Sequence, residues 1–170
     1  MTQDRIKHIV CAVRGKPESR ETVTRAIELT LEHDAKLTYC FVIQAEFLGR
    51  ASPTLTALNA AYRKLEEMGE FSMLILVDRA RRRGVKDVDY LIRKGDIPGQ
   101  LYSAALEIQA DLMVLGRPLL KGGQSVFTDE EFDRFVETIE KDAGILVEQV
   151  VHEIRGINSY DVPGKNLQSD

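Results

Sequence analysis

The sequence lacks the features that mark membrane proteins, secreted proteins and nucleic-acid-binding proteins. It has no apolar run of the roughly 18 to 20 residues that a membrane helix needs. The stretch MTQDRIKHIVCAV has too short an apolar run and no small-residue cleavage site, so we expect no signal peptide and a cytoplasmic location. The formal net charge of −4 gives no electrostatic reason to bind nucleic acid. We therefore expect neither a membrane nor a nucleic acid as a partner.

Cysteine and histidine are scarce. Cys11 and Cys40 stand inside apolar segments and form no Cys-x-x-Cys pair, so we interpret them as buried, reduced thiols, with a redox pair as the alternative. The three histidines, His8, His33 and His152, are far apart and lack the spacing of metal ligands. The sequence therefore predicts no metal site.

The familiar catalytic motifs are also missing. There is no Gly-x-Ser-x-Gly elbow, no Walker motif and no His–Cys pair at a strand end. The carboxylate pairs Glu66–Glu67 and Glu130–Glu131 fall on the surfaces of predicted helices, where they are typical of solvated charge. We therefore identify no catalytic residue and expect that the chain is not an enzyme.

What the sequence does contain is an alternation of apolar, β-branched segments with helical patterns. The predicted strands are 6–13, 36–43, 87–94, 111–115 and 144–151. The predicted helices are 18–34, 53–83, 98–109 and 129–142. This alternation predicts βαβ crossovers and a parallel sheet. We expect one α/β domain over 1–151 and a C-terminal tail over 152–170.

The helix predicted over 53–83 is unusually long. Its pattern indicates a single helix of about 45 Å at 1.5 Å per residue. Ser52 and Pro53 suit its beginning and Gly84 suits its end, while Gly69 could bend it.

Loops that follow parallel strands meet at the carboxyl edge of the sheet, where ligands bind in such folds. Here they are RGKP, QAEFLGRAS, GDIPG and GRPLLKGGQSVFT. The last carries Gly116, Gly122 and Gly123, so its backbone can approach a ligand closely. We therefore expect any binding site at this edge.

Two stretches carry a resemblance to a known family. The run IKHIVCAVRGKPESRETVTRAIELTLEHDAKLTYCFVI and the run RKGDIPGQLYSAALEIQADLMVLGR resemble the universal stress protein family, and the similarity extends over about 6–151. The resemblance implies an open, Rossmann-like sheet of five parallel strands in the order 3-2-1-4-5, with helices on both faces. It also implies a role in stress response, ATP binding in some members, and a homodimer that pairs through strand 144–151.

The chain departs from the pattern of the ATP-binding members. Those members carry an Asp after the first strand and a Gly-x2-Gly-x9-Gly-[Ser/Thr] motif after the fourth. Arg14 occupies the Asp position and Gly116 keeps the first glycine. The remaining motif positions are occupied by Leu119, Asp129 and Glu130. The resemblance therefore implies that ATP binds weakly or not at all.

The first turn of the helix at 129–142 explains this departure. Thr128 is a candidate N-cap and Glu131 completes a capping box, so their side chains satisfy the N–H groups that would meet phosphates. Asp129 and Glu130 would also repel a triphosphate, at about 4 kcal/mol per unit pair at 4 Å in an effective dielectric of 20.

A diverged site remains open at the carboxyl edge. Its candidate residues are Ala12, Val13, Arg14, Gly15, Val42, Leu115, Gly116, Lys121, Gly122, Gly123, Gln124 and Ser125. In one interpretation Arg14 anchors an anion and Gly122 to Ser125 form a nest for it. In the other, Arg14 pairs with Asp129 or Glu130 and closes the site, and the glycine pair only makes a turn.

The sequence is compatible with three functions. The first is a non-catalytic, universal-stress-type regulatory module with weak or no ATP binding. The second is a binder of a nucleotide or other small anionic ligand at the carboxyl edge. The third is an ATP-using enzyme of a related α/β fold, but RGKPES lacks the loop that an ATP pyrophosphatase needs after its first strand. The sequence identifies no cofactor and leaves an adenine nucleotide open.

Overall fold

The computed structural model describes residues 5–14, 19–51, 53–117 and 128–151. Its centre is a five-stranded parallel sheet in the order β3-β2-β1-β4-β5, as predicted. The strands are β1 (His8–Val13), β2 (Lys36–Gln44), β3 (Val88–Gly95), β4 (Leu112–Arg117) and β5 (Leu146–Val151). The helices are α1 (Ser19–His33), α2 (Ala45–Ala51), α3 (Leu55–Arg82), α4 (Ile97–Glu107) and α5 (Asp129–Lys141).

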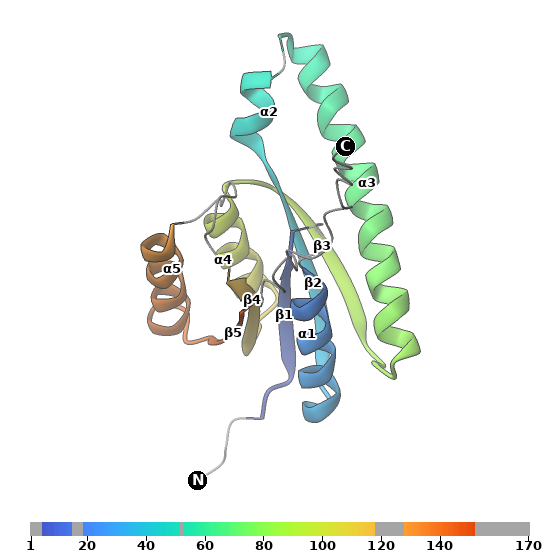
Figure 1. The fold of residues 1–170 in the computed structure, drawn as a ribbon, viewed down its shortest axis with the longest axis vertical. Helices are drawn as coiled ribbons and strands as arrows, with labels where there is room; N and C mark the ends of the chain where they lie inside the picture. Colours follow the sequence, from blue (N-terminus) through green and yellow to red (C-terminus); the bar gives the residue numbers. More distant parts are fainter. Residues whose placement is uncertain (1–4, 15–18, 52, 118–127, 152–170) are drawn as a thin grey trace, which may run out of the picture.

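Helices cover both faces of the sheet (Figure 1). Alternate residues of β1 enter opposite cores because successive strand side chains point to opposite faces. Ile9, Cys11 and Val13 pack with side chains of α1 and α3, whereas Val10 packs with side chains of α4 and α5. The central strands are thus buried on both sides, which is why their sequences read as nearly continuous apolar runs.

The two cysteines lie in different cores. Cys11 packs on the α1 and α3 side and Cys40 on the α4 and α5 side, and both are buried and free. Burial raises the pKa of both thiols, that of Cys40 to about 11. This confirms their interpretation as buried thiols and disfavours a redox pair, since the side chains point to opposite faces of the sheet.

The segment after β2 differs from the prediction. We expected a loop there, but residues 45–51 form the short helix α2, in which Leu48 is buried. The long helix begins at Leu55, not at Pro53, because the Thr54 hydroxyl accepts a hydrogen bond from the Ala57 N–H at 3.1 Å and caps it.

The rest of the long helix follows the prediction more closely. It ends at Arg82, and Gly84 follows with a φ of +102°, the left-handed conformation in which glycine commonly ends helices. Gly69 is buried within it, and a Cβ there would lie 2.8 Å from Cε1 of Phe41. Close packing on the sheet therefore explains this glycine.

The fourth strand runs further than predicted. β4 continues past Leu115, because Gly116 pairs with Val150 and Arg117 pairs with Val151. Arg117 thus belongs to the sheet and not to the loop that follows it. The predicted tail, 152–170, lies outside the described residues.

Candidate functional site

The carboxyl ends of the strands meet at one edge of the sheet. β1 lies between β2 and β4 in the sheet order, and the chain order reverses there, which is where ligands bind in open parallel sheets. Among the predicted site residues, Ala12, Val13 and Val42 lie at the ends of β1 and β2, and Leu115 and Gly116 lie in β4. Arg14 follows β1 and is exposed. The sheet thus brings these positions to the expected edge.

The predicted residues do not all face the same side. Val42 and Ala12 pack against the core under α4 and α5, whereas the side chain of Val13 is buried on the α1 and α3 side. Leu115 is buried under α4 and α5. Gly15 and the loop positions Lys121, Gly122, Gly123, Gln124 and Ser125 lie outside the described residues.

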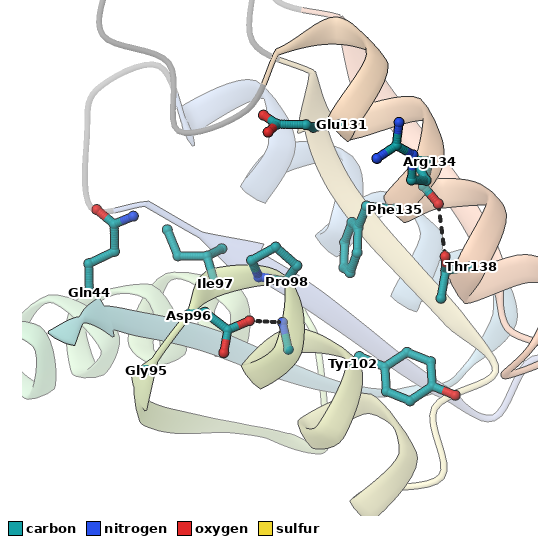
Figure 2. A pocket seen from close by; sticks show the side chains of 11 residues that line it. Gln44, Gly95, Asp96, Ile97, Pro98, Tyr102, Glu131, Arg134, Phe135 and Thr138 are labelled. Carbon is teal, nitrogen blue, oxygen red and sulfur yellow. Dashed lines mark hydrogen bonds between the residues drawn. The ribbon is translucent and has the colours of Figure 1, made fainter. Parts of the chain in front are cut away.

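A pocket of about 480 Å³ opens at this edge, between α4 and α5 (Figure 2). Apolar and aromatic side chains of the two helices form much of its wall, and polar groups stand around them. Its lining residues are Gln44, Gly95, Asp96, Ile97, Pro98, Gly99, Tyr102, Glu131, Arg134, Phe135 and Thr138. The size suits a small organic ligand, since such sites commonly measure about 300 to 1,000 Å³.

One side of the pocket is the beginning of α4. The Asp96 carboxylate accepts a hydrogen bond from the Gly99 N–H at 2.8 Å and caps the helix. Pro98 fits the first turn, where its missing N–H is no loss. Asp96 therefore presents its carboxylate at the pocket while fixing the loop geometry (Figure 2).

The opposite side of the pocket is α5, whose first turn is capped by its own side chains. Glu131 N–H donates to the Thr128 hydroxyl at 3.2 Å, and the Thr128 N–H donates to the Glu131 carboxylate at 2.8 Å. This confirms the predicted capping box. Glu131 also lines the pocket, so a carboxylate stands at the end of the helix that would otherwise favour an anion.

Arg117 ties the end of β4 to α5 and was not singled out from the sequence. Its Nη1 lies 2.8 Å from Oδ1 of Asp133 and its Nη2 lies 3.6 Å from Oδ1 of Asp129. The guanidinium also lies 5.3 Å from the ring centroid of Phe132 and donates to Gln149 at 3.1 Å. The hydrogen bond with Asp133 raises the pKa of the Arg117 guanidinium above its ordinary value, so this side chain stays positively charged.

This arrangement bears on the expected partner of Asp129. The sequence suggested Arg14 as a cation that could pair with Asp129 or Glu130. The structure gives Asp129 an ion pair with Arg117, which lies at the end of β4 because that strand runs two residues beyond Leu115. A cation is thus already placed against the acidic beginning of α5.

The pocket residues from α4 and α5 were also missed. Helical periodicity predicts the two helices that carry these residues, but it does not show which turns of two separate helices face each other. The residues concerned are Tyr102, Arg134, Phe135 and Thr138. The position of residues 95–99 at this edge could be predicted from the sequence, because GDIPG is a loop that follows a strand and reaches the carboxyl edge.

The pocket combines an apolar interior with few charges. Tyr102, Ile97 and Phe135 offer apolar contact, and Arg134 is the cation among its lining residues. The Thr138 hydroxyl donates to the Arg134 carbonyl at 2.9 Å. The described residues contain no cluster of His, Cys, Asp and Glu that could hold a metal ion. The geometry therefore suits a flat organic ligand with little negative charge.

No helix within the described residues is long and apolar enough to span a membrane.

Comparison with known proteins identifies the fold and the family. The model of the universal stress protein family matches residues 5–127. A universal stress protein family member from Burkholderia pseudomallei aligns with a TM-score of 0.64 and 19% identity over 86% of this chain and 97% of its own. Comparison with curated proteins gives no match.

Two further solved structures are similar and have nucleotides bound. A universal stress protein in complex with cAMP has a TM-score of 0.57 and 20% identity over 87% of this chain and 98% of its own. The Archaeoglobus fulgidus protein in complex with dAMP has a TM-score of 0.53 and 14% identity over 85% and 98% of the two chains. The matched segment exceeds half of the chain, and the strand order agrees with the expected one. This chain belongs to the universal stress protein family.

Proposed function

We propose that this chain is a non-catalytic, regulatory member of the universal stress protein family that binds ATP weakly or not at all. The observation that carries the proposal is the beginning of α5. Thr128 and Glu131 satisfy its free N–H groups, and Asp129, Glu130 and Glu131 place three carboxylates in its first turn. A triphosphate seated there would have to displace the capping box and approach these charges.

The non-catalytic part of the proposal is supported by the state of the thiols. Both cysteines are buried with raised pKa values, so neither offers a ready thiolate nucleophile. We also propose a cytoplasmic location, which is compatible with two buried thiols that are not joined in a disulfide.

Calorimetry with ATP tests this function directly. We expect no heat of binding at micromolar protein and nucleotide, and no release of phosphate or pyrophosphate during prolonged incubation. Low-micromolar or tighter ATP binding contradicts the binding part of the proposal, and ATP turnover contradicts its non-catalytic part.

A second candidate function rests on the pocket between α4 and α5. We propose that it binds a small ligand with an aromatic or apolar body and at most a single phosphate. Tyr102 and Phe135 supply aromatic surface, and Arg134 supplies a cation. Two structural relatives hold cAMP and dAMP, each of which has an aromatic base and one phosphate group.

Thermal shift with AMP, cAMP, adenosine and ATP separates the two candidates. Stabilisation by the first three without stabilisation by ATP favours the pocket function. Loss of that stabilisation in Tyr102→Ala, but not in Ser103→Ala on the neighbouring exposed position, would assign the ligand to the pocket. No shift with any of the four compounds would count against it.

We also propose that the protein forms a homodimer through β5. This strand is the last of the sheet, and Leu146 and Val151 on it are 58% and 55% exposed. A strand edge with apolar side chains is normally covered or paired. Light scattering that gives a monomer mass at micromolar concentration would contradict the dimer.

A further inference from the structure

The outward face of α3 carries an unusual set of exposed apolar side chains. Met68, Phe71, Leu74 and Ile75 are 56%, 68%, 51% and 52% exposed. The opposite face of the helix is buried on the sheet through Met73 and three smaller residues nearby. Figure 1 shows α3 running along the outside of the molecule beside β3. Within the described part of the chain, this face has no covering element.

The exposed side chains form a regular stripe. Lys64, Met68, Phe71, Ile75 and Asp78 follow one another at alternating steps of four and three residues. This is the spacing that keeps side chains on the seam between two packed helices. The stripe has three apolar residues in its middle and one charge of each sign at its ends.

The charges are symmetric about Phe71. Lys64 and Asp78 each lie seven residues from it, which is about 10 Å along the helix at 1.5 Å per residue. If two copies of α3 pack antiparallel about a two-fold axis at Phe71, Lys64 of each copy stands level with Asp78 of the other. Parallel packing in register would instead oppose Lys64 to Lys64 and Asp78 to Asp78. The charge pattern therefore favours the antiparallel arrangement, which also aligns the helix dipoles favourably.

The same axis matches the apolar residues. Phe71 meets its own copy at the centre, and Met68, three residues before the axis, stands level with Leu74 of the other helix. Ile75 lies one residue further along, about 1.5 Å beyond Leu74 and level with Glu67 of the other helix. Apolar area is thus removed from water at the centre and opposite charges meet at both ends, as in specific helix–helix contacts.

We propose that the α3 stripe is an interface at which two copies of this chain pack antiparallel about Phe71. In the single chain the end charges have exposed local partners, Lys64 with Glu67 at 3.9 Å and Asp78 with Arg82 at 2.8 Å. Such pairs are weak, so they do not compete strongly with pairing between copies. A single helix pair buries less than the roughly 800 Å² per partner of a standard interface, so the association is reversible and depends on concentration.

This interface is separate from the one proposed for β5. α3 packs on β2 and β3, whereas β5 forms the other end of the sheet. Both contacts can therefore form at once, and together they would join dimers into larger assemblies. The α3 interface also does not depend on the pocket or on any ligand.

Sedimentation velocity of the full chain over a series of concentrations tests the interface. We expect Phe71→Glu to weaken self-association by roughly tenfold or more, because a charge would be placed at the centre of the contact. Leu106→Glu is the matched control, because it places the same charge on another exposed apolar residue. Leu106 lies in α4 and is 46% exposed. The control should keep the mass distribution of the wild type. Equal distributions for wild type and Phe71→Glu overturn the proposal, as does a wild type that stays monomeric throughout.

Charge exchange tests the antiparallel register. Lys64→Glu and Asp78→Lys should each weaken association, and the double variant should restore it because opposite charges again face each other. Failure of the double variant to recover overturns the register.

A cysteine variant gives a second readout of the same axis. Phe71→Cys should form a disulfide between copies under mild oxidation, since the two positions meet at the axis, whereas Ser103→Cys on the exposed surface of α4 should not. The native thiols are buried and do not interfere. Equal cross-linking at the two positions, or none at residue 71, contradicts the proposed packing.

Discussion

The guanidinium of Arg117 at the end of β4 and the carboxylate of Asp133 in α5 are joined by a hydrogen bond of 2.8 Å. The same guanidinium reaches Asp129 at 3.6 Å, so one cation holds two carboxylates of α5 against the sheet. Because the Arg117 side chain is only 26% exposed, this contact is better shielded from solvent than most surface pairs.

Replacing Arg117 should therefore lower stability. We expect Arg117→Gln to reduce the free energy of unfolding by about 1 kcal/mol, at the upper end of what partly exposed ion pairs contribute. Urea unfolding measures the change, and Arg134→Gln on the exposed side of α5 is the control. In a double-mutant cycle, Asp133→Asn should lose most of its effect once Arg117 is absent. Additive effects of the two substitutions would show that the pair contributes nothing.

Removing the acidic residues at the beginning of α5 should improve ATP binding. Asp129 and Glu130 are exposed, so the bulk-water value of about 1 kcal/mol per unit charge pair at 4 Å is the lower bound on their repulsion. We therefore expect Asp129→Gly with Glu130→Ser to raise ATP affinity by roughly tenfold or more. Calorimetry measures the affinity of the double variant against the wild type.

The matched control makes the same two changes at the other end of the helix. Glu140→Ser with Asp142→Gly removes the same number of charges far from the pocket and should leave ATP binding unchanged. Equal improvement in both double variants would attribute the effect to net charge, and no improvement in either would mean that the beginning of α5 is not the obstacle.

Most element bounds could be predicted because they follow from patterns that are local in sequence, whereas the strand order came from the resemblance to the universal stress protein family. Apolar runs mark β1 and β4, and the Thr128–Glu131 spacing identifies the cap of α5. The short helix α2 was missed because seven residues form no stable helix alone, and burial of Leu48 is a tertiary contact that the sequence does not display.

The pocket was predictable only in part. Its Gly95–Gly99 side follows from a loop at a strand end, whereas Tyr102 and Phe135 meet because two helices pack on the same face of the sheet. Arg117 was missed for a related reason. Strand β4 extends to it by pairing with β5, and β-strand ends depend on the neighbouring strand as well as on local composition.

The stability of the protein should fall as the pH drops below about 6.5, in part through His8. Desolvation and the nearby Lys36 lower the pKa of His8 from 6.5, and its Nε2 lies 2.8 Å from the Thr38 hydroxyl. Well above pH 6.5 the ring is neutral in both the folded and the unfolded chain and contributes no pH dependence. As the pH falls through 6.5, the unfolded chain takes up a proton before the folded one, so unfolding becomes more favourable.

His8→Gln should therefore flatten the dependence of unfolding free energy on pH between 7 and 5. Urea unfolding at several pH values in that window gives the two slopes. Parallel curves for the wild type and the variant would show that His8 titrates alike in the folded and unfolded chain.

Gly95, which lines the pocket, should tolerate substitution poorly. Its φ of +143° is rarely adopted by other residues, and a Cβ there would lie 2.9 Å from Nε2 of Gln100. We expect Gly95→Ala to lower the free energy of unfolding by about 1 to 3 kcal/mol through backbone strain. Because Gly95 leads into the Asp96 cap, the same change should also shift the wall of the pocket.

Gly49→Ala is the matched control for this substitution. A Cβ at Gly49 has nothing within 4 Å, and the residue lies in α2, so alanine should stabilise the chain by about 0.5 to 1 kcal/mol. The two variants make the same chemical change and are expected to act in opposite directions in urea unfolding. If both stabilise the protein, the backbone at Gly95 can relax without strain, and the loop that leads from β3 into α4 does not depend on glycine for its shape.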